Sequence, residues 1–224
     1  MTYSYISTVY SEGLPAYRST MKSAAENLVD YLNQRVSGHT FNYRHHGDIG
    51  IDAADYSDDV AFTEACAEEL EIQNELTYDE IIISCHSKLL WGYGYGGWHQ
   101  TNQNTRCYSC TLYAGSGAVD WEVEGFTWHE AGHHNAGHDD ATYAKYVGAS
   151  TWAHKITPMA MSYLFDPDGE PDTAYANKRD SHPDPFCTNL PNDTYYFKSR
   201  YKEDNHEIDR YSSCTLDLIE SRWE

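Results

Sequence analysis

The first 135 residues alternate between short segments typical of β-strands and longer segments with helical periodicity. Residues 3–10 are rich in β-branched and aromatic side chains, a composition that favours a strand. Apolar side chains then recur three and four positions apart, which predicts an amphipathic helix that begins at Pro15 and ends at Ser37-Gly38. Its apolar face is formed by Met21, Ala24, Ala25, Leu28, Val29 and Leu32.

Five further elements are predicted before residue 136. Strands are expected at residues 40–44, 80–85 and 106–113, and helices at residues 59–70 and 121–135. The second strand of this set is a nearly continuous apolar run, typical of a strand covered on both faces. The helix at residues 59–70 is expected to bury Phe62, Ala65 and Cys66. The alternation of strands and helices predicts an α+β fold in which helices pack on a mixed, mostly parallel sheet.

Residues 91–98 combine glycines with large aromatic side chains. We interpret them as a surface loop, and a mobile flap beside a site is the alternative.

The composition changes after Leu164, where five of the seven prolines occur before residue 192 among Asp and Asn. This part is expected to be irregular. We therefore divide the chain into an N-terminal lobe, residues 1–139, and a loop-rich C-terminal lobe, residues 140–224. A final helix is expected to begin at Ser212 or Ser213, with Leu216, Ile219 and Trp223 on one face.

The chain is strongly acidic, with 35 acidic and 15 basic residues and a formal net charge of −20. A surface of this sign repels phosphate backbones, which argues against a nucleic-acid-binding protein. The acidic residues are rich in Asp, and Lys is scarce. We hypothesise a protein adapted to concentrated salt, as in a halophile, because salt screens the repulsion between like charges.

No segment approaches the ~20 apolar residues of a membrane span, so no membrane span is expected. The first residues lack the basic start and the apolar core of a signal peptide. The expectation is either a protein that stays where it is made or a mature chain. The sequence contains no signal for an oligomeric state.

Six cysteines occur, at positions 66, 85, 107, 110, 187 and 214. An even number permits three disulfides and favours an oxidising compartment. Cys107 and Cys110 form a single CxxC pair without a second one. We therefore interpret each of them as part of a structural disulfide, with its partner open, rather than as a metal ligand.

The segment with the clearest chemistry is His129-Glu130-Ala131-Gly132-His133. On a helix, residues four positions apart share one face, so His129 and His133 can bind the same zinc ion. Glu130 is placed to act on a zinc-bound water as general base and then to protonate the leaving amine. This HExxH pattern predicts metal-assisted hydrolysis. His134 is about 100° further around the helix, and we expect it at the surface or behind the ligands.

A second motif, Met161-Ser162-Tyr163, follows downstream. Together the two motifs resemble the metzincins, zinc endopeptidases that combine HExxHxxGxxH with a Met-turn. The resemblance covers about 35 residues. It implies a zincin-like fold, zinc as cofactor, a methionine beneath the metal, and Tyr163 as a further zinc ligand that stabilises the tetrahedral intermediate.

The resemblance leaves the third zinc ligand open, because Ala136 occupies the place of the family's glycine and Gly137 comes one residue later. If the spacing is kept, Asp139 is the ligand, as in snapalysins. If one residue is deleted, Asn135 makes the left-handed turn and His138 is the ligand, as in the reprolysin pattern. Asn tolerates that backbone conformation, whereas it is costly for Ala.

The resemblance further implies a cleft in which a peptide or protein substrate lies along an edge strand. We expect residues 106–113 to be that strand and residues 164–168 to line the pocket beyond the scissile bond. Because metzincins are commonly secreted, it also implies an extracellular protein. Two alternatives are a catalytically silent zinc-binding protein on the same fold and a different HExxH hydrolase with a distant Glu as third ligand.

The salt hypothesis predicts that the free energy of unfolding rises as NaCl is added, because the Debye length falls to about 3 Å near 1 M salt. Denaturant unfolding across a NaCl series measures this. Full stability without salt would contradict the hypothesis.

Overall fold

The structure is a computed structural model that describes residues 2–10, 15–88, 91, 94–136, 146–147, 155–156, 158, 208–211 and 213–223. No helix in this part of the chain has the length and apolar character needed to cross a membrane. The larger part of the expected C-terminal lobe lies outside the described residues.

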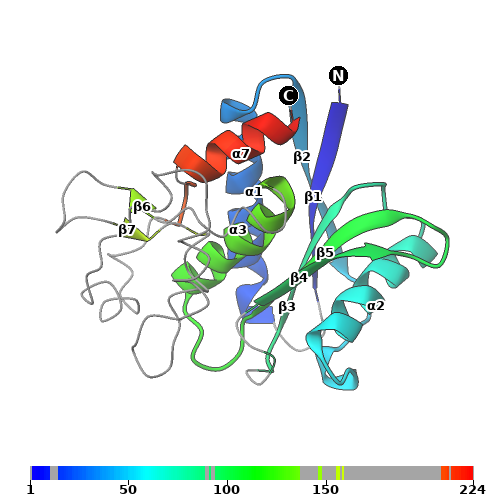
Figure 1. Ribbon diagram of the computed structural model, residues 1–224. Helices are drawn as coiled ribbons and strands as arrows, with labels where there is room; N and C mark the ends of the chain where they lie inside the picture. The colour runs from blue at the N-terminus through cyan, green and yellow to red at the C-terminus, as the bar shows by residue number, and fades with distance from the viewer. Residues whose placement is uncertain are drawn as a thin grey trace, which may run out of the picture.

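A mixed sheet forms the centre of the fold (Figure 1). Its five strands are β1 (Thr2–Tyr10), β2 (His39–Asp48), β3 (Ile81–His86), β4 (Gly94–Gln100) and β5 (Arg106–Tyr113). They lie in the order β2-β1-β3-β5-β4. All neighbours are parallel except β4, which runs antiparallel to β5. Two short strands, β6 (Tyr146–Val147) and β7 (Lys155–Ile156), pair separately.

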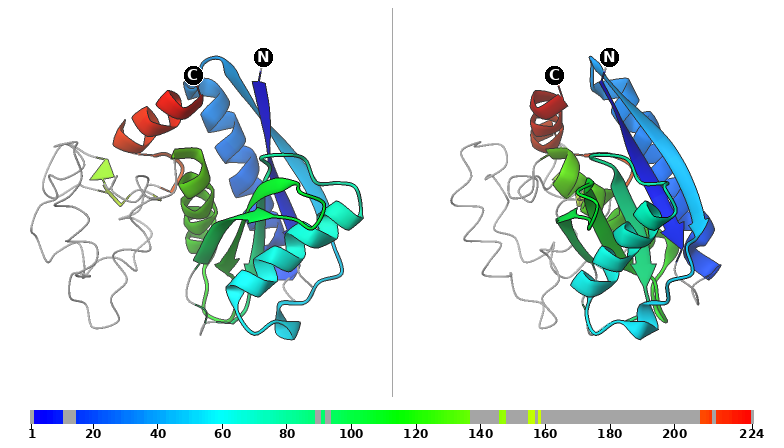
Figure 2. Two further views of the ribbon diagram at one scale, coloured as in Figure 1. Left: turned by 45° about the vertical axis from the view of Figure 1, so that its right-hand side comes forward. Right: turned by 90° about the vertical axis from the view of Figure 1, so that its right-hand side faces the viewer.

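Helices cover both faces of the sheet (Figures 1 and 2). On one face lie α1 (Arg18–Arg35) and α3 (Asp120–Ala136), and on the other lies α2 (Asp59–Ile72). The last described helix, α7 (Ser213–Trp223), packs on α3. Short 3₁₀ turns at Pro15–Tyr17 and Ala53–Asp55 precede α1 and α2. This arrangement confirms the predicted α+β class and its mostly parallel sheet.

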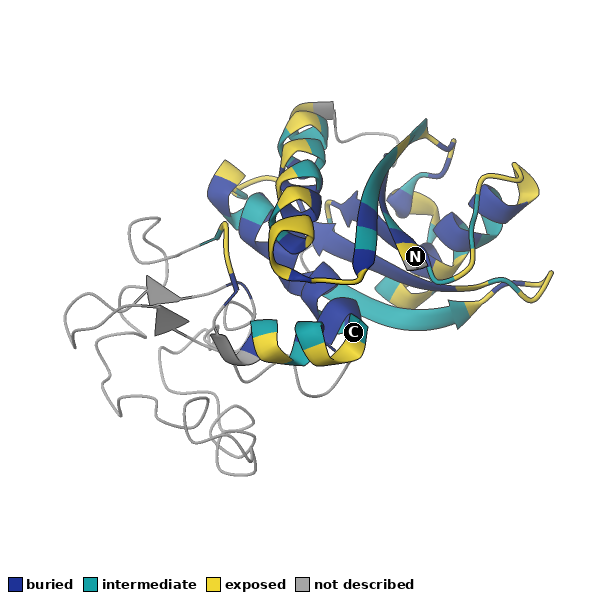
Figure 3. Cartoon of the chain, turned by 90° about the horizontal axis from the view of Figure 1, so that it is seen from above, coloured by how far each residue is buried: buried dark blue, intermediate teal, exposed yellow. Residues whose placement is uncertain are grey.

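The core lies on both sides of β3 (Figure 3). Ile81 and Ile83 belong to the apolar cluster beneath α1 and α3, whereas Ile82 belongs to the cluster beneath α2. All six residues of β3 are buried, as its apolar run predicted. The six apolar positions predicted for the first helix are buried as well. On α2, Phe62 and Cys66 are buried and Ala65 is half-buried.

The interpretation of residues 91–98 as a loop is wrong for the residues from Gly94 onward, which form β4. Glycine is unfavourable in strands, but here the glycines leave room for neighbouring side chains. A Cβ atom at Gly96 would lie 2.5 Å from Oη of Tyr108. The expectation that residues 106–113 form the edge strand is also wrong, because β5 lies between β3 and β4. Among the described strands, β2 and β4 are the edges of the sheet, and β4 is the edge strand that contacts α3.

The strand expected at residues 40–44 is longer, since β2 pairs with β1 over nearly its whole length. A register shift between Thr8 and Val9 accommodates the pairing. In the final helix, Ile219 is buried and Trp223 packs against the core as expected, and Leu218 packs there as well. Leu216 is half-buried.

Four cysteines with described side chains, Cys66, Cys85, Cys107 and Cys110, are free thiols in the structure. All four are buried, and burial raises the pKa of Cys66, Cys85 and Cys107 to about 12. No disulfide joins any two of these four cysteines, and the structural disulfides expected for Cys107 and Cys110 stay a prediction. Pairing that involves Cys187 or Cys214 stays a prediction, because these side chains lie outside the described part.

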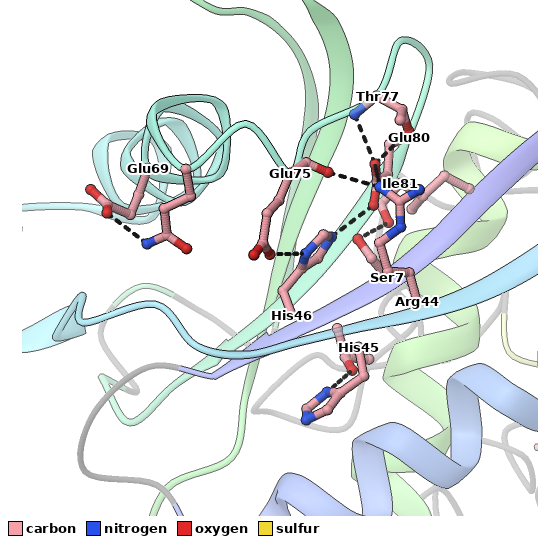
Figure 4. Close-up of polar contacts among 11 residues, drawn as sticks. Ser7, Arg44, His45, His46, Glu69, Glu75, Thr77, Glu80 and Ile81 are labelled. Atoms are coloured by element: carbon pink, nitrogen blue, oxygen red, sulfur yellow. Dashed lines mark hydrogen bonds and ion pairs between the residues drawn. The ribbon is translucent and has the colours of Figure 1, made fainter.

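A polar cluster around the buried Glu80 joins β2 to the start of β3 (Figure 4). Its carboxylate accepts hydrogen bonds from Arg44 Nη1 at 3.3 Å, His46 Nε2 at 2.9 Å and Thr77 Oγ1 at 2.6 Å. The other ring nitrogen of His46, Nδ1, lies 2.7 Å from Glu75 Oε2. His46 therefore bridges two carboxylates.

Burial lowers the pKa of His46, but the hydrogen bonds to Glu80 and Glu75 outweigh it, so this pKa lies above the ordinary value. At Glu80, burial raises the pKa, and the bonds from His46 and Thr77 lower it further than burial raises it. A raised histidine pKa stabilises the fold fully below the unfolded value of about 6.5 and loses its effect as the pH rises through the folded value.

We predict that His46→Gln lowers the free energy of unfolding by about 2 kcal/mol near pH 6, because charged hydrogen bonds are lost. The difference from the wild type should shrink as the pH rises above the folded pKa of His46. Urea unfolding between pH 5.5 and 9 measures it.

His45→Gln is the matched control, since burial lowers the pKa of this neighbouring histidine and the difference there should not shrink with rising pH. A His46→Gln deficit that is constant over the whole range would contradict the assignment.

Candidate metal centre

The helix α3 carries the HExxH segment in its last two turns. Asp120 and Glu122 lie in its first turn, where acidic side chains interact favourably with the helix dipole. Val123, Phe126 and Trp128 are buried and fix the helix against its neighbours. The predicted helix at residues 121–135 is thereby confirmed. His129 and His133 are four residues apart on this helix and share one of its faces.

The structure brings His129 and His133 together. Their Nε2 atoms lie 3.1 Å apart, and the rings are nearly perpendicular at 89°. Two nitrogens that each lie about 2.0–2.1 Å from a tetrahedral zinc ion are separated by about 3.3 Å. The observed separation of 3.1 Å is that of a hydrogen bond between the two rings, and it is about 0.2 Å shorter than one zinc ion requires.

A backbone carbonyl determines which nitrogen of His129 is available. His129 Nδ1 lies 2.7 Å from the carbonyl oxygen of Pro158. A carbonyl oxygen only accepts, so Nδ1 carries the hydrogen and Nε2 carries a lone pair. In the structure this lone pair accepts a hydrogen bond from Nε2 of His133. Burial, followed by the charge of His133, lowers the pKa of His129 to about 3. The ring is thus neutral, as a metal ligand must be.

Pro158 also connects the two sequence motifs. It lies three residues before Met161 and is buried against His129. The chain that leads to the Met-Ser-Tyr segment therefore passes next to the first predicted ligand.

Glu130 is 3 % exposed and lies between α3 and the edge strand. Its Oε1 atom is 4.0 Å from His129 Nε2. Burial, and secondarily the charge of Asp59, raises the pKa of Glu130 to about 8. A cation held by the histidine pair would favour the ionised carboxylate again, since opposite charges at this range stabilise one another.

Several predicted site residues lie outside the described part of the chain: His138, Asp139, Met161 and Tyr163. The choice between His138 and Asp139 therefore stays open. No group of three His, Cys, Asp or Glu side chains that could hold a metal occurs among the described residues.

Of the two alternatives for His134, the one that places it at the surface is wrong. The residue is fully buried, and its ring packs against Trp98, Tyr108 and Trp223. The rotation of 100° that takes it away from His133 turns it toward β4, β5 and α7. His134 therefore contributes to packing behind the site.

Sequence reasoning missed two residues that shape this centre, Pro158 and Gly94. The contact of Pro158 spans 29 residues of sequence and has no local signal. The glycine-rich composition of residues 94–97 was a signal for Gly94, because closely spaced glycines in a strand indicate close approach of neighbours.

Comparison with models of known protein families finds no match, and neither does comparison with curated protein sequences. The interpretation of the centre therefore depends on the geometry of its residues.

We predict that zinc binds the wild-type protein and raises its free energy of unfolding by about 2.7 kcal/mol at a zinc concentration near 100 times the dissociation constant. His133→Ala should lose this effect. Calorimetric titration and unfolding with and without zinc measure it, with His138→Ala and Asp139→Ala compared to identify the third ligand.

His99→Ala is the matched control, because His99 lies on β4 next to Glu64 and Glu68 and not beside His129. Equal zinc binding by the wild type and His133→Ala would contradict the metal centre.

Proposed function

We propose that the chain is a zinc-dependent endopeptidase of the metzincin type. The observation that carries this proposal is the histidine pair of α3, with Nε2 atoms 3.1 Å apart, next to a buried glutamate. Such a combination suits metal-assisted hydrolysis of a carbonyl compound. The Met-Ser-Tyr segment that follows Pro158 favours a metzincin over other HExxH hydrolases.

His129, His133 and either His138 or Asp139 would hold the zinc. When bound, zinc supplies a Lewis acid that lowers the pKa of water and polarises the scissile carbonyl. The hydrogen bond from His129 Nδ1 to Pro158 keeps its ring in the tautomer and orientation that this requires.

Glu130 is the proposed general base. Its carboxylate accepts a proton from the attacking water while the water oxygen bonds to the peptide carbonyl carbon. The same carboxyl then gives this proton to the amide nitrogen as the carbon–nitrogen bond breaks. Its burial restricts the carboxyl to a small region beside His129. Tyr163 is proposed to stabilise the intermediate, as the resemblance implies.

The edge strand supports a peptide substrate. Among the described strands, β4 pairs with β5 alone, so its other edge can bind an extended peptide as an additional strand. Gly94 at the start of β4 lies against Glu130, so a peptide on that edge would extend past the proposed base. An extracellular location and function in concentrated salt stay predictions from composition.

We predict that Glu130→Gln lowers kcat for casein or a quenched peptide about 10²- to 10⁴-fold, the usual contribution of a general base. Zinc affinity should be retained, because the histidine pair is untouched. Hydrolysis is measured at low and high salt, with and without a chelator and with zinc added back.

Glu124→Gln, a change of a half-buried carboxylate on the same helix, is the control and should retain activity. Zinc binding without chelator-sensitive hydrolysis by the wild type would overturn the proposal and favour a silent zinc-binding protein.

A further inference from the structure

The first residue of the edge strand has no side chain at a place where a side chain would collide with the candidate base. A Cβ atom built on Gly94 would lie 2.2 Å from Oε1, 2.9 Å from Cδ and 3.3 Å from Cγ of Glu130. These are the three nearest atoms, and all of them belong to Glu130. The volume that any other residue would need at position 94 is therefore occupied by one carboxyl group.

The pairing of β4 with β5 explains why position 94 faces Glu130. Gly94 pairs with Leu112, which belongs to the apolar cluster beneath α3. Because side chains alternate along a strand, positions 94, 96 and 98 face α3, whereas positions 95 and 97 face the side of α2. Trp98 agrees with this assignment, since its ring packs against His134 of α3.

Packing, rather than hydrogen bonding, positions the carboxyl of Glu130 within the described part of the chain. There its polar contact is with the neutral ring of His129, at 4.0 Å from Nε2, which is beyond hydrogen-bond distance. A carboxyl group held in this way depends on the shape of its surroundings. The bare backbone of Gly94 forms the wall on the side of β4.

We propose that Gly94 is a positioning residue that holds the Glu130 carboxyl beside the histidine pair by leaving room for it at the start of the edge strand. This inference depends on the proposed function for its catalytic meaning, but the contact itself can be tested without activity. A methyl group at position 94 must move either the carboxyl or the strand, and a displacement near 1 Å can lower a catalytic rate by about 100-fold.

The kinetic test compares Gly94→Ala with Gly97→Ala. Gly97 lies on the same strand but on its other face, where the three atoms nearest to an added Cβ atom all belong to the Tyr95 side chain. For Gly94→Ala we expect a 10- to 100-fold loss of kcat with KM and zinc affinity within about twofold of the wild type. Gly97→Ala lies on the same proposed substrate edge and reports the effect of any added methyl group on that strand, so the loss of kcat for Gly94→Ala should exceed that for Gly97→Ala by about tenfold or more. Equal kcat for both variants and the wild type would overturn the proposal.

The shorter Glu130→Asp side chain provides the rescue. Its carboxyl is withdrawn from position 94, so adding Gly94→Ala to Glu130→Asp should change kcat by less than about twofold. A further loss as large as that seen with Glu130 in place would show a general effect on the strand and overturn the proposal.

A double-mutant cycle that measures the free energy of unfolding tests the contact between Gly94 and Glu130 independently of catalysis. Gly94→Ala should destabilise the protein with Glu130 present and destabilise it less with Glu130→Ala, because the collision is then absent. If the wild type shows no zinc-dependent hydrolysis, the proposed function fails, but this coupling should remain. A zero coupling alongside normal hydrolysis would overturn the positioning role and leave the proposed function in place.

Discussion

The hydrogen bond between the ring of His129 and the carbonyl of Pro158 is the interaction on which the candidate centre depends. It holds the hydrogen on Nδ1. Nε2 therefore carries a lone pair and lies 3.1 Å from Nε2 of His133. Without it, the imidazole could rotate or change tautomer, and the helical spacing alone would not produce a metal site. The same bond holds the chain that leads to Met161 against α3.

The sheet supplies the second constraint. Its antiparallel edge strand begins beside Glu130, and the bare backbone at Gly94 allows α3 and β4 to approach closely. Trp98 of β4 and His134 of α3 pack together between the strand and the helix. The helix that carries the predicted ligands is thereby fixed against the strand that would bind a substrate. The predicted metal ligands, the candidate base and the proposed substrate edge are thus positioned by the packing of α3 against β4.

Local patterns predicted much of this fold. The helical face of Met21 to Leu32, the buried strand at residues 81–86 and the helix that carries His129 and His133 follow from periodicity within a few turns of chain. The edge strand was missed because glycine disfavours strands, and the reason for its presence here lies in β5 and α3. The burial of His134 was missed because the elements that cover it, β4, β5 and α7, are distant in sequence.

The buried polar cluster around Glu80 could not be predicted from local patterns either, because its residues are distant in sequence. Nothing in the sequence around His46 indicates that its ring joins Glu75 and Glu80, which are about 30 residues further along the chain.

Anomalous diffraction at the zinc edge from zinc-soaked crystals is the most direct measurement of whether the histidine pair of α3 holds a zinc ion. We expect one strong peak about 2.0–2.1 Å from Nε2 of both His129 and His133. A peak bound elsewhere, with the two rings turned away from each other, would contradict it.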